Sequence, residues 1–194
     1  MKIVFATNNR NKLRELQEML AGSEIEVVGL SDIGCHDEIE ENADTIEGNA
    51  LIKARYVKEH YGYDCFADDT GLEIDALDGA PGVYSARFAG DDCNSERNID
   101  KVLDMMQKET NRKARFVTII ALCIGEEVKT FEGEVQGVIL THRRGTDGFG
   151  YDSIFEPECC GQSFAEMSHE QKNSISHRGR AVRKLVDYLT AVGD

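Results

Sequence analysis

The sequence predicts an α/β fold built on a mixed β-sheet that is flanked by helices. Some segments repeat apolar residues at helical spacing, and short extended apolar runs lie between them, which is typical of strands joined by helical crossovers. Two long extended runs, residues 115–124 and 128–140, are joined by Gly125-Glu126-Glu127 and indicate an antiparallel hairpin. Because crossovers and a hairpin occur in one chain, the sheet is expected to be mixed.

The first elements are a strand, a polar loop, a helix and a second strand. Residues 2–6 form an apolar strand, and the polar loop Thr7–Lys12 follows it. A helix is expected from about Asn11. Its apolar residues share one face, namely Leu13, Leu16, Met19 and Leu20. Residues 25–28 form the second strand.

The middle of the chain contains a helix and a strand that is expected to stop at two acids. Asp44 stands three residues before Glu47, a spacing typical of a capping box, so a helix is expected to begin there. The apolar positions of this helix are Ile46, Ala50, Ala54, Val57 and Tyr61. The strand over 64–67 is predicted to end in a sharp turn at 68–71, before the chain becomes extended again over 72–74.

The remaining elements are a turn and three helical segments. Residues 78–82 are rich in turn-forming residues. A helix is expected near 95–108. Ser168 stands three residues before Gln171 and indicates a capped segment that carries Lys172. The last helix is expected over about 177–192. No linker or internal repeat interrupts the chain, so we expect a single domain over residues 1–194.

The composition excludes several classes of partner. The 194 residues suffice for one sizeable domain or two closely packed lobes. The 36 acidic and 22 basic residues give a net charge of −14, which repels nucleic acid polymers and anionic membranes. No apolar stretch is long enough to span a bilayer. A small phosphorylated substrate is compatible with this charge where basic residues gather locally.

The cysteines favour a reducing compartment. None of the six forms a Cys-x-x-Cys pair, and their spacing fits neither a zinc site nor a disulfide framework. The apolar N-terminal segment is too short for the core of a signal peptide. These features predict a cytoplasmic protein.

The adjacent carboxylates of Asp68 and Asp69 are the most informative pair in the chain. Ligands of open α/β sheets bind outside strand ends, and adjacent strand residues point to opposite faces. One acid can therefore face a site while the other holds the backbone. Carboxylate oxygens suit Mg²⁺, which usually binds together with phosphates. The alternative is a polar turn with two solvated acids.

Two further segments are candidates for binding phosphate or metal. The loop Thr7–Lys12 joins a strand to a helix, where free backbone N–H groups and the helix dipole attract anions. The alternative for this loop is simple helix capping. The acidic run 36–41 is either a solvated loop or the source of a second metal ligand beside Asp69.

Basic and aromatic residues gather in the second half of the chain. Basic islands occur at 142–144 and 177–184, as well as at 10–14, and suit a triphosphate. Phe149 and Tyr151 lie in a Gly-rich turn, where rings can stack on a base. The alternatives are solvated helix charges and a structural turn with buried rings.

Taken in order, these motifs resemble the inosine triphosphate pyrophosphatase family. The matching stretches are Thr7–Lys12, Glu40-Glu41, Glu47–Ala50, Lys53-Ala54, Ala67–Leu72, Ala80–Arg87, Gly148–Asp152, Lys172 and Ser176–Gly179. They span nearly the whole chain, and the ordered set is highly specific. Three positions depart from the usual pattern: Asn8 replaces a common Gly, Thr70 a common Ser, and Ser153 a common Pro.

The resemblance implies an elongated, two-lobed α/β fold with a central mixed sheet and an active-site cleft between the lobes, assembled as a homodimer. It implies Mg²⁺-dependent cleavage of ITP, dITP and XTP between the α- and β-phosphates. The products are a nucleoside monophosphate and pyrophosphate, and aberrant purine nucleotides are thereby removed from the precursor pool.

The resemblance also implies the roles of individual residues. Asp69 is implied to be catalytic, as the proton acceptor for water, and to bind Mg²⁺ together with Glu40. The implied substrate-binding residues are Thr7, Asn8, Asn9, Arg10, Asn11, Lys12, Lys53, Thr70, Phe149, Gly150, Tyr151, Asp152, Lys172, His177 and Arg178. A carboxylate beside Mg²⁺ and cations is expected to stay ionised at neutral pH, as a base must.

Two other classes of protein are compatible with an Asp at the end of a strand. An aspartyl-phosphate phosphatase uses such an Asp, although its Asp-x-Asp spacing is absent here. A nucleotide sensor would bind ITP without turning it over. Pyrophosphate release distinguishes the predicted enzyme from both alternatives.

Overall fold

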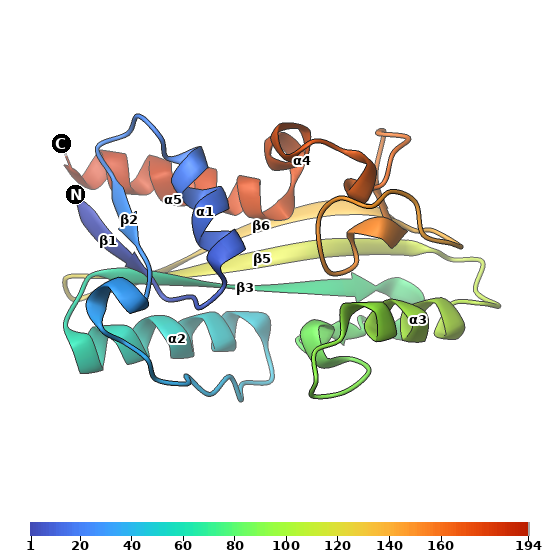
Figure 1. The fold of residues 1–194 in the computed structure, drawn as a ribbon, viewed down its shortest axis with the longest axis horizontal. Helices are drawn as coiled ribbons and strands as arrows, with labels where there is room; N and C mark the ends of the chain where they lie inside the picture. The colour runs from blue at the N-terminus through green and yellow to red at the C-terminus, as the bar shows by residue number, and fades with distance from the viewer. Residues whose placement is uncertain (194) are drawn as a thin grey trace. The chain divides into compact units, whose positions relative to one another are not determined.

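A computed structural model describes residues 1–193 of the chain (Figure 1). The strands are β1 (Lys2–Phe5), β2 (Glu26–Val28), β3 (Cys65–Ile74), β4 (Pro81–Gly82), β5 (Lys113–Ile124), β6 (Glu127–Ile139) and β7 (Phe155–Pro157). The α-helices are α1 (Arg10–Met19), α2 (Ile46–Tyr61), α3 (Ser95–Met105), α4 (His169–Ile175) and α5 (His177–Gly193). Among these residues, no helix combines the length and apolar character that a membrane span requires.

All seven strands belong to one mixed sheet, as predicted. Its order is β2-β1-β3-β5-β6-β7, and β4 pairs with β3. Strand β1 runs parallel to both β2 and β3, whereas the β3–β4 and β6–β7 pairs are antiparallel. The connection from β5 to β6 contains only Gly125 and Glu126, which suffices only for a hairpin between antiparallel neighbours. The α/β class with helices around a mixed sheet is therefore confirmed.

The chain divides into two compact units. Unit 1 contains residues 1–69, residues 119–132 and the described residues from Ala181 onward. Unit 2 contains Thr70–Thr118 and Gly133–Arg180.

The core of unit 1 has two layers because strand residues alternate between the two faces of the sheet. Ile3 and Phe5 pack in one cluster with the apolar residues of α1 and α5. Val4 and Ala6 pack in the other cluster with the apolar face of α2. Figure 1 shows α1 and α5 on one side of these strands and α2 on the other.

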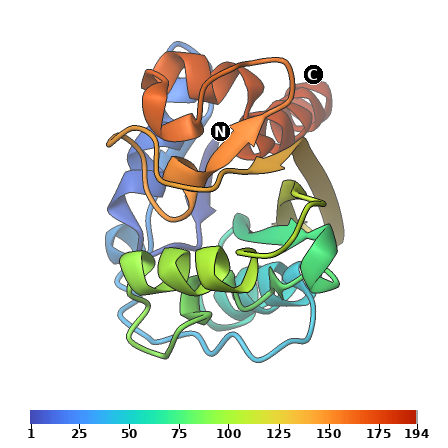
Figure 2. The same ribbon diagram turned by 90° about the vertical axis from the view of Figure 1, so that its right-hand side faces the viewer.

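The core of unit 2 is a single cluster. Ile99, Val102 and Met106, from α3 and the turn after it, pack against buried aromatic residues that include Phe155 and Phe164. Strand β7 pairs with β6 from Gly137 to Ile139, beside α4 and its preceding loop (Figure 2).

Two sequence-based expectations about local structure are wrong. The chain does not turn at Asp68-Asp69, because β3 continues without interruption from Cys65 to Ile74. The N-cap of α2 is Thr45 and not Asp44, since Thr45 has extended backbone angles and its hydroxyl accepts the N–H of Gly48. The other predicted helices and strands are present with ends shifted by a few residues.

Candidate active site

Strand β3 directs its two adjacent acids to opposite faces of the sheet in unit 1. Phe66 packs in the cluster with α1 and α5, and Ala67 packs in the cluster with α2. By strand alternation, Asp68 lies on the α1 side and Asp69 on the α2 side. The last pair between β1 and β3 is Phe5 with Phe66, so both acids lie just beyond the carboxyl end of parallel strand β1.

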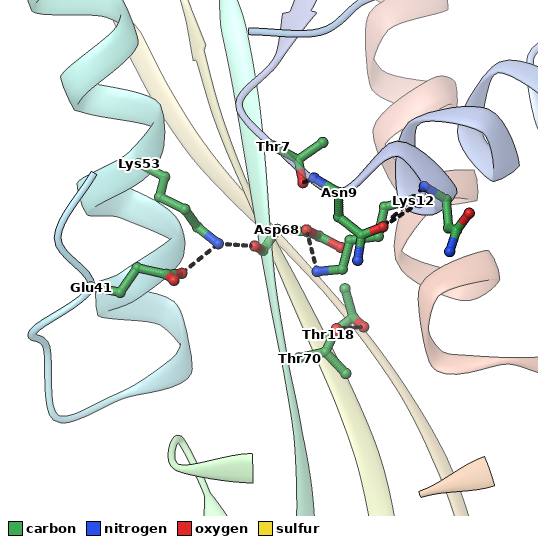
Figure 3. Close-up of polar contacts among 9 residues, drawn as sticks. Thr7, Asn9, Lys12, Glu41, Lys53, Asp68, Thr70 and Thr118 are labelled. Carbon is green, nitrogen blue, oxygen red and sulfur yellow. Dashed lines mark hydrogen bonds and ion pairs between the residues drawn. The ribbon is translucent and has the colours of Figure 1, made fainter. Parts of the chain in front are cut away.

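Asp68 is held by lysine and is almost completely buried. Its side chain is only 3 % exposed, and Lys12 Nζ donates to its Oδ1 at 3.0 Å. The start of α1 supplies this lysine, whereas α2 supplies Lys53 from the other side of β3 (Figure 3). Lys53 Nζ donates to the backbone oxygen of Asp68 at 2.6 Å and forms an ion pair with Glu41 Oε1, also at 2.6 Å.

The pKa values of Lys53 and Asp69 are both raised, but for different physical reasons. Burial opposes the charge on Lys53, but the carboxylates of Asp68, Glu41 and Asp69 outweigh it and raise the pKa of the lysine. Burial is also the main effect on Asp69 and raises its pKa from 3.8 to about 6. Lys53 opposes this rise, while Glu41 adds to it.

Asp69 therefore combines a raised proton affinity with an available carboxylate. Among residues 1–193, no hydrogen bond or ion pair engages its side-chain oxygens. With a pKa of about 6, the carboxylate is mostly ionised at pH 7. It can accept a proton from a neighbouring water, which is the requirement for a general base.

The first loop is organised by its own side chains. Asn9 is the N-cap of α1, and its Oδ1 accepts the N–H groups of Asn11 and Lys12 at 3.0 and 3.2 Å. The Thr7 hydroxyl accepts the N–H of Asn9 at 3.1 Å. The capping alternative is thus correct for Asn9. This capping also fixes the start of the helix that carries Lys12, so capping and a role in binding are compatible.

The other loop residues, together with Glu40, are exposed. The side chains of Asn8, Arg10 and Asn11 lie at the surface. Glu40 is exposed too, and no hydrogen bond or ion pair holds its carboxylate in the described chain, whereas Glu41 is occupied by Lys53. Residues 1–193 contain no preformed group of three or more His, Cys, Asp or Glu residues that would hold a metal ion by itself.

Thr70 belongs to unit 2 and is half-buried. Its hydroxyl shares a 2.7 Å hydrogen bond with the hydroxyl of Thr118, which is fully buried in β5 (Figure 3). Since each hydroxyl has one donor and two acceptor sites, the pair keeps one O–H donor and further acceptor sites beyond this bond.

A second group of predicted site residues comes together in unit 2. Lys172 Nζ forms a buried ion pair with Asp152 Oδ2 at 2.7 Å and lies 4.4 Å from the centre of the Phe149 ring. Asp152 Oδ2 also accepts the N–H of Phe149 at 3.0 Å. This carboxylate leaves no room for a side chain at Gly148, whose Cβ would approach it to 2.3 Å. The Gly-rich turn is therefore shaped around Asp152.

The two aromatic residues of this turn have different environments. Phe149 is 44 % exposed, and the Arg178 guanidinium carbon lies 5.6 Å from its ring centre. Tyr151 is buried in the core of unit 2 and its hydroxyl donates to the backbone oxygen of Ser85 at 2.6 Å. The alternative of a structural turn is thus correct for Tyr151, and Phe149 is the ring available for stacking.

His177 and Arg178 are buried at the start of α5 and not at its surface. The His177 ring stacks on Phe116 at 4.7 Å between centres. Gly150, between the two aromatic residues, has a φ of +58°, which favours glycine. The basic residues at 142–144 do not join this group. Arg143 and Arg144 form ion pairs with other acids of unit 2.

Sequence reasoning did not predict the partners of Glu41 and Asp68, and it overlooked Thr118. Glu41 stands beside the predicted ligand Glu40, and no sequence pattern distinguishes the two acids. The residues alone left open which acid of the pair faces a site, and in the structure Asp68 pairs with Lys12. Thr118 lies far from Thr70 in the sequence, and only the neighbouring positions of β3 and β5 bring them together.

A mixed α/β sheet with paired carboxylates and lysines beyond a strand end is compatible with an enzyme that acts on phosphates. The chain belongs to the Ham1 family, whose model matches residues 3–188. It is 55 % identical to the dITP/XTP pyrophosphatase of Christiangramia forsetii, over 98 % of this chain and all of the relative. A second dITP/XTP pyrophosphatase, from Flavobacterium psychrophilum, is 53 % identical, with 97 % of this chain and 99 % of the relative covered.

A solved structure confirms the same family at the level of the fold. The Ham1 protein of Staphylococcus aureus matches with a TM-score of 0.91 and 37 % identity, covering 98 % of this chain and 99 % of the other.

Proposed function

We propose that this protein is a nucleoside triphosphate pyrophosphohydrolase that converts ITP, dITP and XTP to the nucleoside monophosphate and pyrophosphate. The dITP/XTP pyrophosphatases that it resembles at more than half of their positions support this activity. The structural observation that carries the proposal is the unengaged carboxylate of Asp69 beside Lys53. The physiological role is the removal of aberrant purine nucleotides from the precursor pool.

The residues of unit 1 are proposed to handle the triphosphate. Asp69 accepts a proton from the attacking water, and its pKa of about 6 leaves it mostly ionised at neutral pH. Lys12 and Lys53 supply positive charge against the phosphate oxygens. The side chains of the first loop, including Asn8 and Arg10, add hydrogen-bond donors from an exposed position. Thr70 is proposed to touch the substrate through its hydroxyl.

The available carboxylates fit Mg²⁺. This ion binds one or two carboxylates and completes its coordination with water and substrate phosphates, so a preformed cage is not required. Asp69 and Glu40 have carboxylates that no other residue of the described chain engages, and we propose them as the protein ligands. Mg²⁺, when bound, stabilises negative charge on the phosphate oxygens.

The group in unit 2 is proposed to hold the purine base. Phe149 offers an exposed ring for stacking, and the cations of Lys172 and Arg178 lie 4.4 and 5.6 Å from its centre. Lys and Arg carry donors and no acceptors, so they match the 6-oxo group of hypoxanthine or xanthine and not the 6-amino group of adenine. A buried donor without its acceptor costs about 1–3 kcal/mol, which favours ITP over ATP.

One incubation tests this activity against its alternatives. The protein is mixed with ITP or ATP in the presence of Mg²⁺, and pyrophosphate and orthophosphate are measured separately. Pyrophosphate from ITP, with much less from ATP, is expected. Orthophosphate would support an aspartyl-phosphate phosphatase, tight binding without turnover would support a sensor, and equal turnover of ATP would contradict the proposed base selectivity.

Assembly and location are proposed on separate grounds. All six cysteines are free thiols, which supports the reducing cytoplasm. The homodimer rests on the family resemblance, and light scattering should give twice the 21.6 kDa mass of one chain.

A further inference from the structure

An irregular loop connects the short helical turn Ser31–Ile33 to α2 and carries Glu40 and Glu41. We refer to residues 36–44 as the acidic loop. Most of its side chains are exposed, and none of these nine positions belongs to a helix or a strand. Its conformation must therefore be held by side-chain contacts.

One contact fastens the start of the acidic loop to α2. The hydroxyl groups of Tyr56 and Tyr61 both donate to Asp37 Oδ2, at 2.9 and 2.6 Å. Hydrogen bonds to a charged carboxylate are stronger than those between neutral groups. The His60 ring stacks on Tyr56 at 4.1 Å between centres and steadies the ring that bonds Asp37.

A second contact fastens the end of the same loop. The buried Asn49 side chain accepts the N–H of Ala43 at 2.9 Å. Ala43 also fits closely against Gly48, where an added Cβ would approach the Ala43 Cβ to 2.6 Å. The acidic loop is thus tied to α2 on both sides of Glu40 and Glu41.

These contacts lie on the helix that supplies Lys53. Tyr56 stands three residues after Lys53 on α2, so the two side chains share a face of the helix. Glu41 forms its ion pair with Lys53 at 2.6 Å, and Lys53 donates to the backbone of Asp68. Asp37 is thus bonded to the face of α2 that carries Lys53, and Lys53 contacts the strand that carries the proposed base.

We propose that Asp37, Tyr56 and Tyr61 form a clamp that positions Glu41 and, through it, Lys53 for binding of the triphosphate. These are positioning residues and do not touch the substrate. The inference rests on the proposed function, because it assigns a role in the same site. The clamp keeps the loop in the conformation in which Glu41 reaches Lys53.

The test removes the two hydroxyl groups and retains both rings, in a Tyr56→Phe/Tyr61→Phe variant. Tyr188→Phe is the matched control, because the Tyr188 hydroxyl donates to Glu127 at 2.7 Å in the same unit but far along the sequence from the acidic loop. Asp37→Asn removes the charged acceptor and provides a second variant if the double variant folds poorly.

Two measurements test the clamp, one of the acidic loop itself and one of substrate binding. Hydrogen exchange of the Ala43 amide, which donates to Asn49, is expected to be about tenfold faster in the clamp variant and unchanged in the control. The KM for ITP at saturating Mg²⁺ is expected to rise about threefold to tenfold, because Glu41 no longer positions Lys53. A fall in kcat is also expected, because Glu40, a proposed Mg²⁺ ligand, lies in the same loop.

A double-mutant cycle shows whether the effect passes through Glu41. Adding the clamp mutations to Glu41→Gln should leave KM unchanged, because the residue that they position has already lost its charge. Unaltered exchange in the clamp variant, or faster exchange without a rise in KM, would overturn the proposal, and so would additive effects with Glu41→Gln. Failure of the proposed function would appear in the unmodified protein, whereas failure of the clamp appears only in the variants.

Discussion

At the scale of single residues, two neighbouring carboxylates differ because a strand turns them to opposite faces. Asp68 is buried and paired with Lys12, which stabilises its charge. Asp69 is half-buried on the α2 side, and burial raises its pKa to about 6. Asp69, whose ionised form is the less favoured of the two, has the carboxylate that is available for chemistry. This agrees with the tendency of shifted pKa values to cluster at functional sites.

This difference predicts that Asp69→Asn stabilises the protein in a pH-dependent way. The folded-state pKa lies above the ordinary value of 3.8, so ionised Asp69 destabilises the fold above about pH 6, and the penalty disappears below about pH 4. After allowance for solvent screening, we expect a gain of about 1–2 kcal/mol at pH 8, or about 2–8 °C in melting temperature.

Thermal unfolding in the presence of a chelator at pH 8 and pH 4 measures this gain. The control is Asp91→Asn, an exposed acid outside both groups. An Asp69→Asn variant with no gain at pH 8, or with an equal gain at both pH values, would contradict the raised pKa.

The Asp152–Lys172 pair predicts a large loss of stability on truncation. Both side chains are buried, and Asp152 also accepts the N–H of Phe149. Asp152→Ala leaves a buried cation and an unpaired N–H, so it should cost about 3–5 kcal/mol. Arg97→Ala breaks the exposed ion pair with Asp92 and should cost less than about 1 kcal/mol. Urea unfolding of both variants measures the two losses of stability. Equal losses would contradict the larger cost expected for the buried pair.

At the scale of elements, local periodicity predicted the helices and strands. Long-range strand pairing determined the features that periodicity did not predict. Helices at 46–61 and 95–105 were predictable from apolar spacing alone. The turn expected at Asp68-Asp69 is absent, because the partners of β3 keep this polar stretch extended. Strand propensity does not reveal such partners.

The same limit explains which site residues were predictable. The family motifs gave the family and most of the residues in both groups. They implied Glu40 as a metal ligand and did not predict that Glu41 pairs with Lys53, because this pairing depends on how α2 presents the lysine. They also grouped Tyr151 with Phe149, whereas the packing of unit 2 buries one ring and exposes the other.

The N-cap of α1 yields a prediction that separates capping from binding. Asn9→Ala removes the acceptor of two helix N–H groups and should cost about 1 kcal/mol of stability. Asn94 caps α3 in the same way, through the N–H of Arg97. Asn94→Ala should lose similar stability and retain its KM for ITP, whereas Asn9→Ala should raise KM severalfold. Equal KM values in the two variants would assign Asn9 to capping alone.

At the scale of the whole molecule, a net charge of −14 coexists with binding of an anionic substrate. Cations are concentrated where the proposed function requires them, with Lys12 and Lys53 beside the β3 acids in unit 1 and Lys172 and Arg178 beside Phe149 in unit 2. The three lysines are themselves paired with acids, as is Arg143 outside both groups. The position of these cations, rather than the net charge of the chain, is therefore what suits an anionic substrate.

The most direct measurement of the central claim is pyrophosphate release from ITP and Mg²⁺ by Asp69→Asn, compared with Glu38→Gln. Glu38 is an exposed acid of the same acidic loop, so its variant controls for the loss of one charge. Loss of a general base should reduce kcat about 10²–10⁴-fold in the folded Asp69→Asn protein and leave Glu38→Gln near the parent rate. A folded Asp69→Asn protein that releases pyrophosphate at the parent rate would contradict the account.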